Sequence, residues 1–174
     1  MPIWPFKRSR ADEHAELLLD AVIRASRQPT LFGEGRTPDT LEGRFEVVAL
    51  HAGLALVRLQ AEPGAETLTQ AFTDKLFRYL DAGLREDGVG DLVVPKRMRK
   101  LAGAFYGRLE AYTAALKAED RAALAAAIRR NVLGVEGASF AMDVAGYLRQ
   151  AAEQQAKADI SALLGDAGWP AYTV

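Results

Sequence analysis

Residues 81–112 read DAGLREDGVGDLVVPKRMRKLAGAFYGRLEAY, and the rest of the chain is organised around them. The stretch joins the end of one helical pattern to the start of another through a loop that contains Gly88 and Gly90. Pro95 suits the first turn of the second helix, because a proline lacks a backbone N–H that would go unused there. The first turns of this helix then carry four cations, which are Lys96, Arg97, Arg99 and Lys100.

These four cations oppose the helix dipole. A helix N-terminus carries about half a positive charge, so each cation there costs roughly 0.3–1 kcal/mol, whereas an acidic residue would be stabilising. Two interpretations follow. Together with Arg85 and Arg108, the cations either form one positive face that binds a negative partner, or they are a solvated surface offset by nearby acidic residues.

Apolar residues recur at helical spacing on both sides of this stretch, and no alternating strand pattern of useful length appears. We therefore expect an all-α fold, a single-domain bundle of about six helices with short connections. The expected helices lie at about residues 12–27, 41–60, 66–86, 95–118, 119–133 and 139–158. Residues 1–11 are expected to form a flexible N-terminal segment, 12–158 the helical domain and 159–174 a C-terminal tail.

The fourth helix has an apolar seam whose spacing is close to a heptad and which is most simply explained as core. The seam consists of Met98, Leu101, Phe105, Leu109, Tyr112 and Leu116. Gly103 and Gly107 lie on the other side of the helix. Since a glycine inside a helix costs roughly 1 kcal/mol relative to alanine, we expect something to approach the backbone there, an adjacent helix rather than a bound partner.

The second helix is apolar over most of its circumference, which predicts a central position. Thr40 is its expected N-cap, because a threonine hydroxyl can accept a bond from a free backbone N–H. Arg44 and His51 stand two turns apart on this helix, and His51 is interpreted as a core histidine. The only other histidine is His14, so the sequence predicts no metal site and no cofactor.

Bulk composition excludes several classes of function. The chain has 174 residues and a net charge of −1, which argues against a protein that coats DNA. It has no cysteine, which excludes disulfides and thiol catalysis. Motifs for serine hydrolases, phosphate-binding loops, dinucleotide folds and zinc proteases are absent, so we do not expect an enzyme; the alternative is a small helical enzyme that uses His51 with a carboxylate.

The N-terminus combines two aromatic residues with cations but lacks the apolar core of a secretory signal. It is either a frayed terminus or a weak interfacial foothold, with the aromatic side chains among lipid headgroups and the cations on anionic lipid. The residues concerned are Trp4, Phe6, Lys7, Arg8 and Arg10. An amphipathic organelle presequence is also absent, which favours a bacterial protein.

Two ordered motifs resemble the signature of a known family. One runs from Gly88-Val89-Gly90-Asp91-Leu92 through the four cations to Ala104-Phe105-Tyr106-Gly107-Arg108-Leu109, and the other is Pro38-Asp39-Thr40-Leu41-Glu42-Gly43-Arg44-Phe45 followed by Leu50-His51. The pattern resembles that of the ubiquinol–cytochrome c chaperones, which are assembly factors of respiratory complex III. The resemblance covers roughly residues 15–150.

The resemblance implies a non-enzymatic chaperone that binds newly made cytochrome b, sometimes close to the ribosome and with a second assembly factor. It also implies peripheral membrane placement. Because the chain lacks cysteine, which fits a reducing compartment, and lacks an organelle presequence, we expect the bacterial cytoplasm with peripheral contact at the inner membrane. The candidate binding residues are Arg85, Lys96, Arg97, Arg99, Lys100, Phe105, Tyr106 and Arg108, with Leu31 and Phe32 as further apolar candidates unless they pack into the core. Asp39, Arg44 and His51 are expected to brace the fold by polar bonding. The alternative function is a peripheral protein that binds anionic lipid and has no cytochrome b client.

Overall fold

Six α-helices make up most of the chain, as the apolar spacing predicted. The structure is a computed structural model that describes residues 9–133 and 138–173, and within these ranges it contains no strand. The helices are α1 (Arg10–Ser26), α2 (Leu41–Gln60), α3 (Glu66–Glu86), α4 (Val94–Lys117), α5 (Arg121–Ile128) and α6 (Ala138–Lys157). The all-α prediction is confirmed, and every helix starts within two residues of its predicted position.

Side-chain caps fix three of these starts. The oxygen of Ser9 accepts a hydrogen bond from the backbone N–H of Asp12, Thr40 accepts one from Gly43, and Asp120 accepts one from Ala123. Each cap satisfies a backbone donor that the first turn of a helix leaves unpaired. Thr40 is therefore the N-cap of α2, as its position in the sequence predicted.

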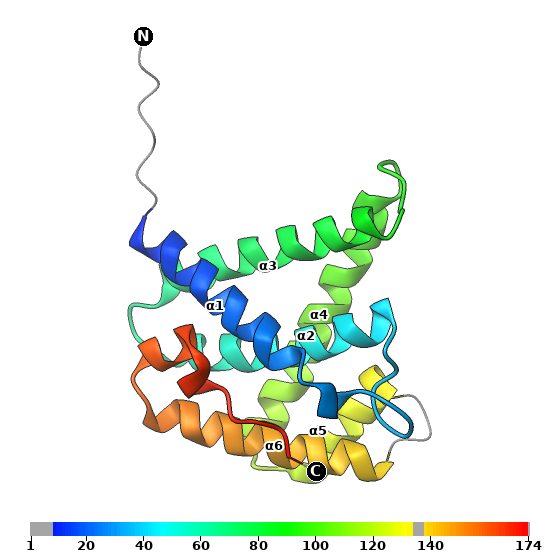
Figure 1. Cartoon of the computed structure of the whole chain (residues 1–174). Coiled ribbons are helices and arrows are strands. Elements are labelled where there is room, and N and C mark those ends of the chain that lie inside the picture. Colours follow the sequence, from blue (N-terminus) through cyan, green and yellow to red (C-terminus); the bar gives the residue numbers. More distant parts are fainter. Residues whose placement is uncertain (1–8, 134–137, 174) are drawn as a thin grey trace.

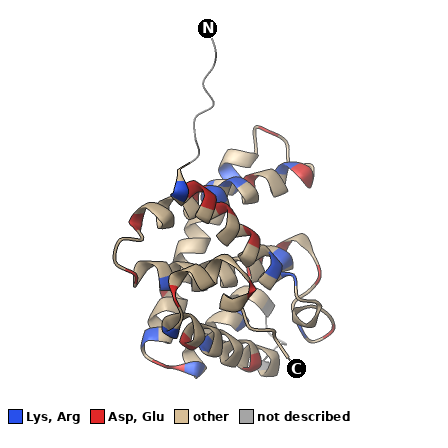
Figure 2. Cartoon of the chain, turned by 60° about the vertical axis from the view of Figure 1, so that its left-hand side comes forward, with Lys and Arg blue, Asp and Glu red and all other residues tan. Residues whose placement is uncertain are grey.

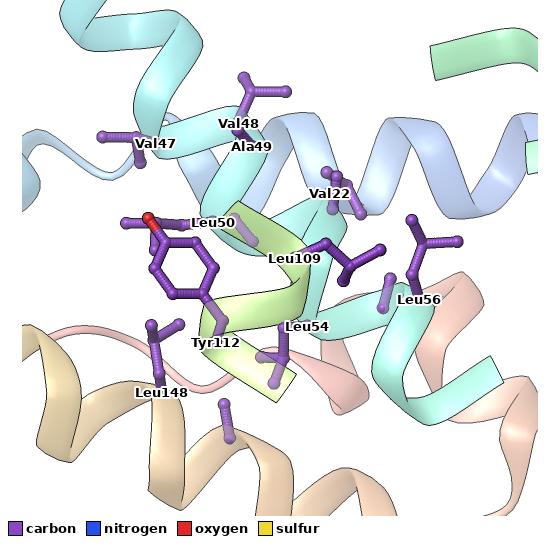
Figure 3. Close-up of a cluster of buried hydrophobic side chains, with 14 of the residues drawn as sticks. Val22, Val47, Val48, Ala49, Leu50, Leu54, Leu56, Leu109, Tyr112 and Leu148 are labelled. Carbon is purple, nitrogen blue, oxygen red and sulfur yellow. The ribbon is translucent and has the colours of Figure 1, made fainter. Parts of the chain in front are cut away.

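α2 runs through the middle of the molecule and contacts α1, α3, α4 and α6, which explains why it is apolar on nearly all sides (Figure 1). Figure 3 shows Leu109 and Tyr112 of α4 lying among the leucines of α2, with Val22 of α1 and Leu148 of α6 closing the cluster. Among the described residues, no helix combines the length and the apolar character needed to cross a membrane.

The last part of the chain packs onto the domain. After α6, two short 3-10 turns, Ile160–Leu164 and Asp166–Gly168, lead to Trp169, which is buried. The indole Nε1 of Trp169 donates to the carbonyl of Leu163 at 3.1 Å. Tyr172 is buried as well, and its carbonyl accepts a hydrogen bond from Thr30 at 2.9 Å, so the end of the chain is joined to the loop after α1.

Helix α5 departs from the predicted form at its end. The sequence suggested one helix to about Leu133, but the α-helical bonding stops at Ile128 and a π-helical turn covers Arg129–Leu133. The predicted break at residues 134–137 lies outside the described residues.

The expectation that a neighbour approaches Gly103 and Gly107 is wrong. A Cβ atom added at either glycine would meet nothing within 4 Å among the described residues, so that side of α4 is open. The opposite holds at Gly43, where an added Cβ would lie 1.9 Å from the carbonyl oxygen of Pro38. Of these three glycines, Gly43 alone is required by close packing, because the loop before α2 folds back against its first turn.

Candidate functional site

The turn between α3 and α4 forms an exposed corner that extends beyond the other helices at the upper right of Figure 1. Gly88 ends α3 with a φ of +82°, a conformation that glycine adopts without strain. The carbonyl of Gly90 then accepts hydrogen bonds from the N–H groups of Val93 and Val94, at 2.8 and 3.2 Å, and so starts α4. Six exposed residues come next, and we name this group the α3–α4 corner. Its members are Leu92, Val93, Lys96, Arg97, Arg99 and Lys100.

The four cations of the corner are exposed, and none forms an ion pair with another residue of the described ranges. The first turn of α4 contains no acidic residue that would offset the helix dipole. Figure 2 shows blue and red segments interspersed along most of the chain, so in this view the molecule has no wholly positive side. Any contact with a negative partner therefore depends on local cations such as these.

Arg85 and Arg108 do not join this group, which corrects the predicted six-cation face. Arg85 donates to Asp81 at 2.7 Å and also pairs with Asp91 across the turn. Arg108 donates to Glu46 of α2 at 2.6 Å, and its guanidinium lies 5.9 Å from the ring centre of Phe45. Both arginines are thus used within the fold, and four of the six predicted cations remain available.

The pair of Glu46 and Arg108 is largely buried between α2 and α4, with side chains 13% and 16% exposed. Burial raises the pKa of Glu46 to about 7, although the positive charge of Arg108 acts in the opposite direction. Oε2 of Glu46 and the Nε and Nη1 atoms of Arg108 have no hydrogen-bond partner among the described residues. The pair joins two helices in the interior, where removal of one partner would leave an unpaired buried charge.

Neighbouring aromatic residues on α4 have opposite surroundings. Phe105 is 1% exposed and packs edge-on against Phe77 of α3, with ring centres 5.7 Å apart, so its predicted role as a contact residue is wrong. Tyr106 is 50% exposed, and its ring centre lies 6.0 Å from that of Phe77. Of the two predicted aromatic contacts, only Tyr106 is accessible to a partner.

Tyr106 stands at the edge of an open hollow between α2, α3 and α4, with a volume of about 550 Å³, which we call the Tyr106 hollow. Its apolar lining consists of Leu56, Leu59, Phe77, Tyr106 and Leu109, and its polar lining includes Glu62, Glu66, Thr69, Gln70, Thr73 and Asp74. A second hollow of about 460 Å³ shares Tyr106 and Leu109 and continues along α4 to Lys117. No pattern in the sequence indicated either hollow, because residues of separate helices supply the lining, from three helices in the first hollow and two in the second.

His51 is a core residue with both ring nitrogens bonded. Nδ1 donates to the carbonyl of Val47 at 2.8 Å, so Nε2 must accept from the hydroxyl of Tyr147 at 3.0 Å. Gln28 in turn donates to the Tyr147 hydroxyl at 3.3 Å and accepts from the backbone N–H of Tyr172 at 2.6 Å. Burial lowers the pKa of His51 to about 4, which keeps the imidazole neutral in the tautomer that this network needs.

Asp39 and Arg44 lie together at the start of α2, apart from the His51 network. Arg44 donates to both carboxylate oxygens of Asp39, at 2.6 and 3.3 Å, and these hydrogen bonds lower the pKa of Asp39. Both side chains are exposed. The structure therefore brings Asp39 and Arg44 together and places His51 elsewhere.

The other predicted contact residues are those of the Leu31–Phe32 loop and those of the N-terminal segment. Leu31 is buried and Phe32 packs against the core, so this loop offers Leu31 to no partner. At the N-terminus, Trp4, Phe6, Lys7 and Arg8 lie outside the described residues. Arg10 is described, and it is the exposed first residue of α1.

No group of three or more His, Asp or Glu side chains within residues 9–133 and 138–173 is arranged to hold a metal ion. His51 also has no carboxylate among its hydrogen-bond partners. What this region of the chain offers is a hollow with mixed apolar and polar lining, beside exposed cations of α4 that form no ion pair within the described residues.

Comparison with known proteins gives two matches. Residues 34–167 match the model of the family described as ubiquinol–cytochrome c chaperone. The whole fold is similar to the crystal structure of the Cbp3 homolog from Brucella abortus, with a TM-score of 0.80 and 39% sequence identity, over 95% of this chain and 92% of that one. Among curated proteins, none matches the chain significantly.

Proposed function

The chain belongs to the ubiquinol–cytochrome c chaperone family, and we propose that it binds newly made cytochrome b while the ubiquinol–cytochrome c reductase complex is assembled. In this proposal it acts by binding rather than by catalysis. It works in the bacterial cytoplasm with peripheral contact at the inner membrane, and a second assembly factor and the ribosome are further partners.

The observation that carries the proposal is the position of the Tyr106 hollow beside an open face of α4. Arg99, Gly103 and Tyr106 recur at helical spacing, so they share one side of the helix. Since nothing lies within 4 Å of a Cβ added at Gly103, a partner segment can approach the backbone between the arginine and the tyrosine. An apolar segment of a membrane protein that has not yet reached its partners would bury surface in such a hollow.

Tyr106 is the proposed anchor of this contact. A half-exposed aromatic side chain beside a hollow is the type of residue that contributes most to protein–protein binding. The acidic side chains at the rim, Glu66 and Asp74, favour a client segment with cations next to its apolar residues. The neutral, fully bonded state of His51 supports a structural rather than a catalytic task for the only buried histidine among the described residues.

The test is recovery of cytochrome b from solubilised membranes of the source organism by the tagged protein. Tyr106→Asp places a charge at the hollow, and Met142→Asp is the matched control, because Met142 is an exposed apolar residue of α6. We expect the wild type and Met142→Asp to recover cytochrome b equally and Tyr106→Asp to recover about tenfold less or lower. Circular dichroism checks that both variants are folded. Equal recovery by Tyr106→Asp would exclude the hollow as the client site, and no recovery by the wild type would refute the client itself.

A further inference from the structure

Leu92 and Val93 are exposed without a packing reason. Leu92 is 97% exposed, more than any other large apolar residue in the described ranges, and Val93 is 46% exposed. The next residue, Val94, is fully buried, so it supplies the apolar contact that the corner itself needs. Exposure of two adjacent aliphatic side chains at the most projecting turn is unfavourable in water and indicates an apolar environment for them.

The surroundings of this aliphatic pair are positive. Lys96, Arg97, Arg99 and Lys100 follow within eight positions, and no acidic residue occurs between Leu92 and Leu109. Acidic residues do lie on the other side of the turn, where Asp91 pairs with Arg85 and where Glu86 and Asp87 end α3. Residues 85–100 still hold five cations against three acidic residues, in a chain whose net charge is −1.

We propose that the α3–α4 corner binds the anionic surface of a lipid bilayer, with Leu92 and Val93 among the headgroups and the four cations on lipid phosphates. Aliphatic residues enter the boundary between headgroups and acyl chains, while lysine and arginine gain from the negative surface potential. The N–H groups of Val93 and Val94 are already bonded to Gly90, so insertion leaves those two donors satisfied. The inference deepens the peripheral placement in the proposed function, but it needs no client.

RNA is the other polyanion that these cations could meet, and the aliphatic pair argues against it. Proteins that bind single-stranded RNA place aromatic side chains on the bases, whereas the residues between Leu92 and Leu101 include no aromatic side chain. Contact of leucine and valine with a base or a phosphate contributes little binding free energy, whereas burial of the same side chains in a lipid interface is directly favourable.

The absence of cysteine allows a direct test of insertion in the full chain. Leu92→Cys is labelled with a polarity-sensitive dye and mixed with vesicles of phosphatidylcholine that contain either no or about one-third phosphatidylglycerol. Met142→Cys is the matched control, since α6 lies at the opposite end of the molecule in Figure 1. We expect a blue shift and a rise in emission only for Leu92→Cys and only with anionic vesicles. No change at position 92 while the protein still pellets with anionic vesicles would overturn the assigned contact.

Two unlabelled variants separate lipid from RNA. Leu92→Asn with Val93→Asn is expected to lower vesicle binding about tenfold. Substitution of the four cations by alanine is expected to lower it roughly 600-fold at low salt, because each of the four contributes roughly fivefold. Binding to a ribosomal RNA fragment serves as the comparison. If the asparagine variant binds vesicles as well as the wild type, or if the corner binds RNA but not vesicles, the proposal fails. Vesicle binding without recovery of cytochrome b would instead refute only the client.

Discussion

The two halves of α4 have the same secondary structure but different surroundings. In the first half, Lys96 and its neighbouring cations are exposed and unpaired within the described part of the chain, and Gly103 faces open space. In the second half, Leu109 and Tyr112 pack among the leucines of α2 (Figure 3). Arg108 is paired with Glu46 of α2. The first half of α4 thus leaves its cations and Gly103 open, while the second half is held in the interior, and we propose that binding falls to the first half and stability to the second.

The largest effect is expected where the two tasks meet, at the adjacent residues Phe105 and Tyr106. Phe105→Ala removes a buried ring that packs on Phe77 and should lower the free energy of unfolding by about 3–5 kcal/mol. Tyr106→Ala should cost less than about 1 kcal/mol, because half of that side chain is exposed. Urea denaturation followed by circular dichroism measures both. Similar losses for the two variants would show that Tyr106 belongs to the core and is not reserved for a partner.

A somewhat smaller effect is expected when pH is lowered, because acid protonates His51 in the interior of the protein. The pKa of His51 is lowered to about 4, whereas a histidine in the unfolded chain titrates near 6.5. The unfolded chain therefore binds the extra proton between these values, and His51 should make the protein less stable as pH falls from about 6.5 to 4, by about 3 kcal/mol in total.

The control for this prediction is His51→Gln, which has no titrating group at the same position. Its free energy of unfolding should vary less with pH across that window, and the difference between the two proteins isolates the histidine. Equal pH dependence would mean that the imidazole is not held neutral by burial.

The sequence predicted the helices well because local signals place them. Thr40 and Asp120 cap helices by local hydrogen bonds, and Gly88 ends one by its positive φ. The partners of single residues were not predictable in this way. His51 meets Tyr147, 96 positions away, and Arg108 meets Glu46, 62 positions away, so only the packing of helices decides which polar groups are paired.

Tertiary packing also explains why the contact roles predicted for Arg85, Arg108 and Phe105 were wrong. Arg85, Arg108 and the free cations look alike in sequence, and tertiary contacts alone distinguish those that are used within the fold. Phe105 and Tyr106 differ only in which side of α4 they occupy, and the Tyr106 hollow exists only once three helices meet. The unfavourable position of the cations relative to the helix dipole was visible from the start, and it did single out the exposed region.

The smallest effect should occur at the two open glycines of α4, Gly103 in the first half and Gly107 just past the midpoint. Gly103→Ala and Gly107→Ala are each expected to raise the free energy of unfolding by about 0.5–1 kcal/mol, because an added methyl group meets no neighbour and alanine favours the helix. Thermal denaturation measures the gain. Gly43→Ala is the opposite control, since its methyl group would clash with the carbonyl of Pro38 and should destabilise the protein. A loss at Gly103 would show that this side of α4 is packed after all.

The central claim is that the cations at the start of α4 serve binding and not folding. The most direct test is the free energy of unfolding of the variant in which Lys96, Arg97, Arg99 and Lys100 are all alanine, measured by urea denaturation beside the wild type. We predict equal stability or a gain of about 1 kcal/mol or more, because four charges that oppose the helix dipole are removed and alanine is a good helix former. A loss of more than about 1 kcal/mol would contradict the claim, since the cations would then be holding the fold together.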